Sequence, residues 1–152
     1  MSHSAAPHPV APSREDFPYF ETITLRYADN DVNGHVNNAH YYSYFDTAVE
    51  GFLRATALRG VLAGEVFTPV VASSCRYFQE ISYPGDVVLG VKLARLGKTS
   101  LTYEIAIFTT ATGPTAAALG TFTTVCTNKE SRRPTEIPAA VRTYFEQSLK
   151  PF

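Results

Sequence analysis

The chain has 152 residues, of which 45% are hydrophobic and 18% charged, so it can bury a core and is expected to fold as one compact domain. Its formal net charge of −1 gives no overall attraction to nucleic acid or to an anionic membrane, so binding of either through net charge is excluded. Cys75 and Cys126 fit no metal-ligand spacing, and there is neither a secretory signal nor an apolar run approaching the ~20 residues of a membrane span. We therefore expect a cytoplasmic protein with reduced, buried cysteines.

Residues 1–16 are expected to form a flexible tail, because they are rich in Pro, Ser, Ala and His and show no periodicity. One domain is expected over residues 17–152. Its first predicted element is a strand at residues 22–27, where β-prone residues alternate. The turn-forming run D-N-D-V-N-G follows at residues 29–34.

A long amphipathic helix is predicted next, beginning at Asn37 or Asn38, either of which can cap it. Apolar residues recur at spacings of four and three, which indicates one helical face: Tyr41, Phe45, Ala48, Phe52 and Ala55. We expect Gly60 and Gly64 to end the helical region.

The second half of the chain is predicted to be mostly β. Strands are expected at residues 70–81 (one long strand or a bent pair), 87–93, 101–107 and 116–127, and a short terminal helix at 137–149. Consecutive strands favour hairpin connections and an antiparallel sheet. One long helix on such a sheet is an α+β layer.

Chemistry-bearing side chains are concentrated between residues 26 and 46. This strand-to-helix region holds three carboxylates (Asp29, Asp31 and Asp46), two histidines (His35 and His40) and four asparagines. Turns that join regular elements carry function more often than cores do.

Two metal-binding interpretations of this region are weak. The run Asp29-x-Asp31-x-Asn33-Gly34 matches the start of an EF-hand loop, but its twelfth position is His40 instead of Glu, and a strand precedes it. For a transition metal, His35 and His40 are five residues apart, a spacing that does not align them on one helical face. No metal and no cofactor is expected.

A third interpretation is catalysis on a carbonyl compound. The N–H groups and dipole at a helix start favour negative charge, so they could stabilise the oxyanion formed from a thioester. A neighbouring carboxylate could activate water or attack directly. The alternative is that both turn aspartates only cap the turn and the helix.

The run D-N-D-V-N-G-H-V-N-N-A-H-Y at residues 29–41 resembles the D-x-D-x-x-G-H-V-N-N-x-x-Y motif of the 4-hydroxybenzoyl-CoA thioesterase family of hotdog proteins. The similarity extends from about residue 17 to residue 141 and includes the stretches Y-P-G-D at 83–86 and G-K-T-S at 97–100. The resemblance implies a hotdog fold, in which a curved antiparallel five-stranded sheet wraps around one long central helix. It also implies homodimers, often paired into tetramers, with active sites at the subunit interface.

The resemblance implies a catalytic role for the second Asp of the motif, which is Asp31. The backbone N–H of Asn38 would polarise the carbonyl, Gly34 would allow close backbone approach, and His35 is included in the predicted catalytic set. Some related hotdog enzymes carry the carboxylate on the central helix, so Asp46 and Glu50 remain alternatives.

The expected function is hydrolysis of an acyl-CoA thioester. Substrate-binding residues are expected on the helix, at the end of a strand and in a loop that could hold the CoA phosphates: Tyr41, Phe45, Phe78, Lys98, Thr99 and Ser100. A non-catalytic module that binds acyl-CoA or acyl carrier protein is the alternative. Acyl chain length, the carrier, and general-base versus nucleophilic catalysis stay open.

Overall fold

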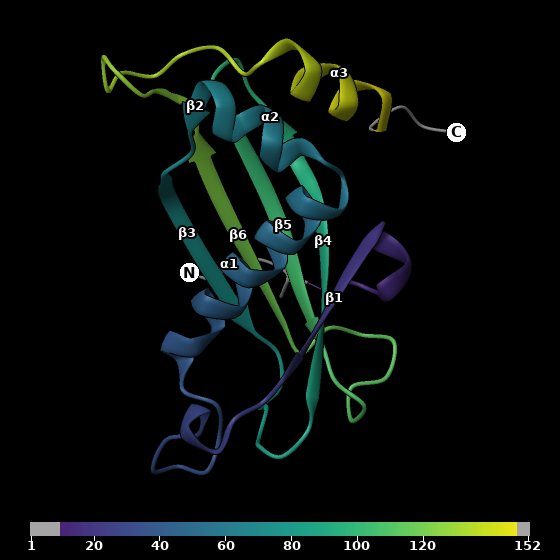
Figure 1. Cartoon of the computed structure of the whole chain (residues 1–152). Helices are drawn as coiled ribbons and strands as arrows, with labels where there is room; N and C mark the ends of the chain where they lie inside the picture. The colour runs from purple at the N-terminus through teal and green to yellow at the C-terminus, as the bar shows by residue number, and fades with distance from the viewer. Residues whose placement is uncertain (1–9, 149–152) are drawn as a thin grey trace, which may run out of the picture.

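A computed structural model describes residues 10–148 (Figure 1). Five antiparallel strands form the main sheet in the order β1-β4-β5-β6-β3. Their bounds are Tyr19–Thr24 (β1), Val70–Tyr77 (β3), Asp86–Leu96 (β4), Ser100–Phe108 (β5) and Ala118–Val125 (β6). Two short strands, β2 (Val66–Phe67) and β7 (Thr127–Asn128), pair separately.

Helix α1 (Asn38–Ala55) lies across one face of the sheet, as Figure 1 shows. It is followed by α2 (Leu58–Glu65), and α3 (Ala139–Ser148) packs at the same end of the molecule. Two short 3-10 helices, η1 (Arg14–Asp16) and η2 (Tyr27–Asp29), flank β1. The expected α+β arrangement of an antiparallel five-stranded sheet around one long helix is therefore confirmed.

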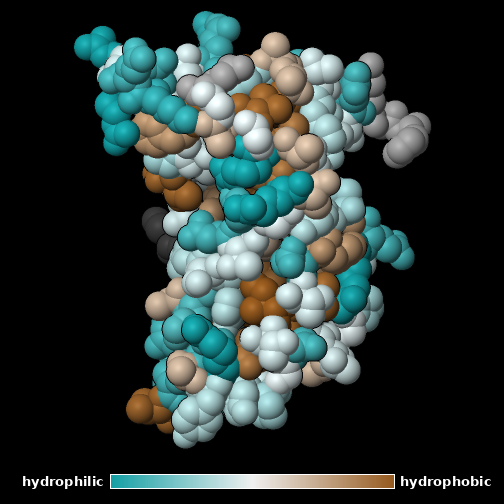
Figure 2. Space-filling view, in the orientation of Figure 1, coloured by the Kyte–Doolittle hydropathy of each residue, from teal (hydrophilic) through white to brown (hydrophobic). Residues whose placement is uncertain are grey.

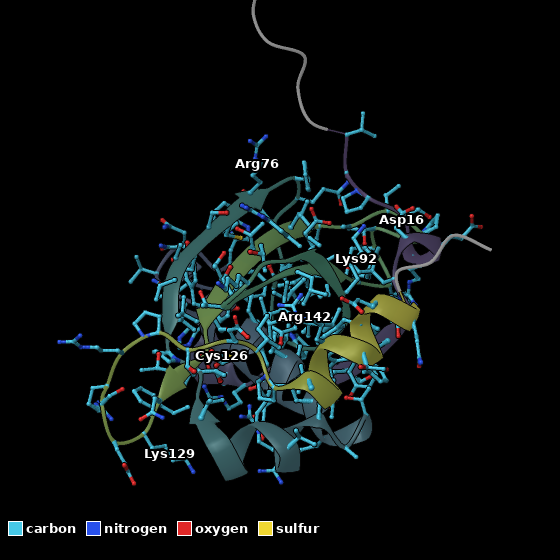
Figure 3. All side chains as sticks on the ribbon, turned by 90° about the horizontal axis from the view of Figure 1, so that it is seen from above. Asp16, Arg76, Lys92, Cys126, Lys129 and Arg142 are labelled. Atoms are coloured by element: carbon cyan, nitrogen blue, oxygen red, sulfur yellow. The ribbon has the colours of Figure 1, made fainter. Side chains whose placement is uncertain are left out.

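The core fills the space between α1 and the sheet. Along β4, the residues that face the helix are buried: Val87, Leu89, Val91 and Leu93. They meet the buried stripe of α1 formed by Tyr41, Phe45, Ala48 and Phe52. Figure 3, the view from above, shows the helices gathered on one side of the sheet and the side chains of Arg76 and Lys92 on the other. Alternation along the strands thus places the apolar face toward the helix.

Two expectations about the elements are corrected. The segment with Gly60 and Gly64 does not end the helical region, because both glycines lie inside α2. Leu58 and Leu62, one turn apart, are both buried in the core, and this tertiary packing outweighs the low helix propensity of glycine. In addition, β3 forms no hairpin with β4, since it pairs with β6 at the far edge of the sheet.

The first described residues run along the loop before β6. The Arg14 N–H donates to the Pro114 carbonyl at 3.0 Å, and the Ala116 N–H donates to the Pro12 carbonyl at 2.9 Å. Residues 1–9, most of the expected tail, lie outside the described residues, as does Leu149 at the end of the expected terminal helix.

Both cysteines are free thiols, with Cys126 buried and Cys75 half-buried. Burial raises the pKa of both thiols, that of Cys126 to about 11, which keeps them protonated at neutral pH. Between residues 10 and 148, no helix has both the length and the apolarity needed to cross a membrane.

Candidate active site

The segment between η2 and α1 is a tight turn held by backbone hydrogen bonds. The Asp31 N–H donates to the His35 carbonyl at 2.9 Å, and the Gly34 N–H donates to the Asp31 carbonyl at 3.0 Å. Gly34 has a φ of +79°, a left-handed conformation that glycine adopts without strain. The Val36 N–H donates to the Ile81 carbonyl at 2.7 Å, which fixes the turn to the segment after β3.

Asp29 is fully buried, and both of its carboxylate oxygens are occupied. Oδ1 accepts a hydrogen bond from Arg26 Nε at 3.0 Å, and Oδ2 accepts from the Arg26 N–H at 3.0 Å and the Tyr44 hydroxyl at 2.7 Å. Burial acts to raise the pKa of Asp29, but these hydrogen bonds and the Arg26 charge outweigh it and hold the pKa below the ordinary 3.8. Asp29 is therefore an ionised anchor that ties the turn to α1.

Asp31, two residues later, has a different environment. It is half-buried, and its Oδ1 accepts a hydrogen bond from the Asn33 N–H at 2.8 Å. Its Oδ2 has no hydrogen-bond partner within residues 10–148. One oxygen thus stabilises the turn, as an Asx side chain commonly does, while the other is available to water or to a substrate.

Asn37 and Asn38 form the start of α1. Asn37 is the N-cap, and its Oδ1 accepts a hydrogen bond from the Ala39 N–H at 2.9 Å. Asn38 is the first helical residue, and the part of the chain that the structure describes offers no acceptor for its N–H. An unpaired N–H at the positive end of a helix dipole is suited to binding a carbonyl oxygen that gains negative charge.

A cavity of about 290 Å³ opens beside this helix start. The turn and α1 supply half of its lining and the end of β3 with the following residues supplies the rest: His35, Val36, Asn38 and Tyr41, then Tyr77, Phe78, Gln79 and Glu80. The structure thus brings together four of the predicted site residues, whereas Asp31 and Gly34 lie in the adjoining turn.

His35 and Glu80 pair at the cavity, with Nε2 of His35 2.9 Å from Oε2 of Glu80. This contact joins the two segments that form the walls. Sequence reasoning missed Glu80, Gln79 and Tyr77 as lining residues. Their proximity to the predicted Phe78 was the available signal, but the pairing of β3 with β6, which directs this strand end toward α1, could not be read from the sequence.

Of the three aromatic residues expected to bind the acyl group, two line the cavity. Tyr41 and Phe78 are on its wall, while Phe45 is fully buried behind it. Burial, with smaller contributions from the nearby Cys75 and Glu80, raises the pKa of Tyr41 to about 12, so its hydroxyl stays protonated at neutral pH.

The loop expected to hold the CoA phosphates lies at the end of the molecule opposite the Asp31 turn. Lys98 and Thr99 connect β4 to β5, and Ser100 begins β5. This connection lies near α3, and the Lys98 carbonyl accepts hydrogen bonds from the Ile137 N–H and from Arg142. Helix α1 has 18 residues, and this length, roughly 27 Å, separates the loop from the Asp31 turn. One protomer alone does not bring them together.

The alternative carboxylates on α1 are not in the cavity lining. Glu50 forms ion pairs with Arg54 at 2.8 Å and with Arg59, as expected for a solvated ladder of charges. Asp46 is exposed on the outer face of the helix. Figure 2 shows this α1 face as a mixture of hydrophilic and hydrophobic patches.

The metal-binding interpretations gain no support from the geometry. Asp29, the first ligand of the calcium loop, uses both oxygens for Arg26 and Tyr44. Across residues 10–148, no three His, Cys, Asp or Glu side chains are grouped as a metal site would require.

The fold has counterparts among known proteins. The PA5185 protein from Pseudomonas aeruginosa strain PAO1 is 39% identical, with a TM-score of 0.81 over 90% of this chain and 95% of that one. A DHNA-CoA thioesterase from Staphylococcus aureus is 18% identical (TM-score 0.74; 85% of this chain, 89% of that one). The 1,4-dihydroxy-2-naphthoyl-CoA thioesterase Slr0204 from Synechocystis is 15% identical (TM-score 0.74; 88% and 98%). These similarities show the hotdog fold.

A family model described as the thioesterase-like superfamily matches residues 25–145. This match covers most of the chain, and the chain therefore belongs to that superfamily. Protein YsmA from Bacillus subtilis (strain 168) is 22% identical over 89 residues, a match that spans 59% of this chain and 60% of YsmA. The narrower 4-hydroxybenzoyl-CoA family remains a prediction.

Proposed function

We propose that the protein hydrolyses an acyl-CoA thioester to a free carboxylic acid and CoA. The observation that carries the proposal is the available oxygen of Asp31 in the turn that leads to α1, together with the unpaired N–H of Asn38, which lines an apolar cavity. Membership of the thioesterase-like superfamily supports it. The names of the Staphylococcus and Synechocystis proteins favour CoA as the carrier. No cofactor is needed for this chemistry, and a cytoplasmic location remains our expectation.

The reaction would begin with the thioester carbonyl oxygen on the Asn38 N–H. In the general-base route, Asp31 takes a proton from water, the water oxygen bonds to the carbonyl carbon, and the resulting tetrahedral oxyanion is stabilised at the helix start. Collapse of this intermediate breaks the carbon–sulfur bond and releases the CoA thiolate, which takes up the proton from Asp31 and leaves as the thiol. In the nucleophilic route, Asp31 itself bonds to the carbonyl carbon and expels the thiolate, and water then hydrolyses the anhydride.

The other site residues have supporting roles in this proposal. Gly34 would let the turn backbone approach the thioester, and His35, held by Glu80, would border the entrance. Tyr41 and Phe78 would contact the acyl group, with Phe45 behind them. Lys98, Thr99 and Ser100 would bind the CoA phosphates.

A homodimer would place the phosphate-binding loop of one protomer within reach of a thioester bound at the Asp31 turn of its partner. Within residues 10–148, strand β3 is an edge strand with an unpaired side, and it carries exposed apolar residues that include Val71 and Tyr77. If two copies pair their β3 edges about a two-fold axis, the strands run antiparallel. The Asp31 end of one protomer then faces the loop end of its partner. Pairing of two such dimers into a tetramer is a further expectation.

Replacement of Asp31 by Asn tests the catalytic assignment. The amide oxygen can still accept the Asn33 N–H, so the turn should persist, but Asn can neither accept a proton from water nor attack. We expect kcat for thiol release to fall by about 10²–10⁴-fold with unchanged thermal stability, measured over short, long, branched and aromatic acyl-CoAs. Turnover near the wild-type rate would rule out the assigned role.

The thiol-release assay also distinguishes hydrolysis from the alternative function. A module that only binds acyl-CoA or acyl carrier protein would show saturable binding by calorimetry and no thiol release from any thioester, and Asp31→Asn would leave its affinity unchanged.

A further inference from the structure

The cavity beside the Asn38 N–H is bordered on the α1 side by the aromatic side chain of Tyr41. Tyr41, which is only 3% exposed, lines the cavity and meets the ring of Tyr77 with centroids 4.9 Å apart. Phe45 lies one helical turn further along the same face and is 0% exposed. An acyl chain that extends from the helix start along α1 would therefore meet Tyr41 first and Phe45 next.

The sheet has small residues beneath Phe45, which leave room for its ring. In the β3–β6 register, Cys75 pairs with Gly120 and Tyr77 pairs with Ala118. The side that faces α1 therefore carries the small residues Cys75, Ala118 and Gly120, and Tyr77 is the large residue at the end next to the cavity. A Cβ atom added at Gly120 would lie 2.3 Å from Cε2 of Phe45. The Phe45 ring thus rests directly on the β6 backbone and fills the depth that a side chain at position 120 would otherwise occupy.

Other aromatic rings hold Phe45 in this place. Its ring centroid is 5.9 Å from that of Tyr42 and 5.7 Å from that of Phe122, both in edge-to-face geometry. Phe45 is consequently a fixed wall. Without its ring, the small residues at positions 75, 118 and 120 would form the floor of a trench that continues the cavity between α1 and the sheet.

We propose that Phe45 sets the length limit of the acyl pocket and that the substrates are CoA thioesters of compact acids, either short aliphatic chains or a single ring. The proposal rests on the thioesterase function proposed above. The cavity volume of about 290 Å³ is slightly below the roughly 300–1,000 Å³ of usual ligand pockets, which agrees with a compact acyl group.

A matched pair of variants tests this proposal. Phe45→Val removes the wall, whereas Phe52→Val makes the same change two turns later on the same helix face, where Phe52 lines a different cavity together with Tyr144 and Phe145. The readout is the ratio of kcat/KM for butanoyl-CoA to kcat/KM for dodecanoyl-CoA. We expect the wild-type ratio to exceed about tenfold, since each methylene that a pocket accepts or refuses changes kcat/KM by about 10–200-fold.

Phe45→Val should lower this ratio by at least about tenfold, and Phe52→Val should leave it within about twofold of wild type. Phe45→Leu, a smaller change that is easier to accommodate in the core, should shift the ratio in the same direction if Phe45→Val does not fold. A wild-type ratio near one, or equal shifts in the position-45 and position-52 variants, would overturn the proposal.

Failure of the proposed thioesterase function can be distinguished from failure of the proposed length limit. If the wild-type protein releases thiol from neither ester, catalysis is rejected, and the length limit is read from equilibrium binding of the same two esters. Tighter binding of butanoyl-CoA, reversed in the Phe45 variant, then supports the limit, and equal binding overturns it.

Discussion

Two aspartates in one turn have different surroundings, and we assign them different roles for that reason. Asp29 has no exposed surface and both oxygens occupied, whereas Asp31 is half-buried with one oxygen available. The sequence shows both residues in a turn but not their burial, so the residues alone did not distinguish capping from catalysis. The family motif pointed to Asp31. Its Asx bond to Asn33 supports the capping interpretation, and its second oxygen is available for the proposed catalytic role.

Stability of the turn should depend on pH through Asp29. Its folded pKa lies below the ordinary 3.8, so its stabilising contribution is fully present above that value and is lost as the pH falls through the folded pKa. We expect Asp29→Asn to lower the free energy of unfolding at about pH 7 by about 1.5–3 kcal/mol, the typical value of hydrogen bonds to a charged group.

Urea unfolding of both proteins at about pH 7 and about pH 3 measures this effect. The gap between wild type and Asp29→Asn should narrow at the lower pH, where the wild-type carboxylate begins to protonate. A gap of equal size at both pH values would show that Asp29 does not stabilise the fold through its charge.

The start of α1 is the element on which the site depends, and it could be predicted well. The sequence offered Asn37 or Asn38 as the cap, and the structure assigns the cap to Asn37 and the first helical position to Asn38. Helix α2 could not be predicted in the same way, because its stability comes from burial of Leu58 and Leu62 against distant residues. Local propensity at Gly60 and Gly64 pointed to the opposite outcome.

The helix start also allows one N–H to be removed with little other change. Proline is tolerated at the first helical position, and Asn37 already has the extended backbone, with ψ of 138°, that a following proline requires. Asn38→Pro should therefore preserve folding and lower kcat for thiol release by about 10²–10³-fold, as loss of one oxyanion donor does.

Asn38→Ala is the matched control for this change. It keeps the backbone N–H and should keep kcat within about tenfold of wild type, well short of the loss of an oxyanion donor. Equal kcat for the Pro and Ala variants would show that the N–H does not bind the carbonyl oxygen.

At the scale of the whole molecule, one chain does not bring together all the residues proposed for the site. The alternation and hairpin signals predicted the antiparallel strands correctly, but the placement of β3 at the edge is a long-range pairing with β6 that no local pattern encodes. This placement leaves the β3 edge next to the cavity, while the Lys98 loop lies beyond the far end of α1 (Figure 1).

Sedimentation analysis should therefore find a dimer of twice the 16.7 kDa chain mass, or a pair of such dimers. Val71 is 59% exposed and lies at the irregular point of the β3–β6 register, so Val71→Lys should weaken edge pairing without unpairing β6. We expect at least about a tenfold rise in the dimer dissociation constant, which corresponds to about 1.4 kcal/mol.

Thr110→Lys adds the same charge to an exposed loop between β5 and β6 and should leave the dimer intact. A wild-type monomer with full thioesterase activity would contradict the proposed role of the partner subunit.

The central claim concerns the position of the thioester carbonyl, and a crystal structure can measure it directly. The ligand would be an acyl-CoA analogue in which a methylene group replaces the thioester sulfur, so that the carbonyl remains but cannot be hydrolysed. The account predicts the carbonyl oxygen within about 3.2 Å of the Asn38 nitrogen, with an Asp31 oxygen facing the carbonyl carbon directly or through one water. A carbonyl bound elsewhere, with Asp31 turned away from it, would contradict the account.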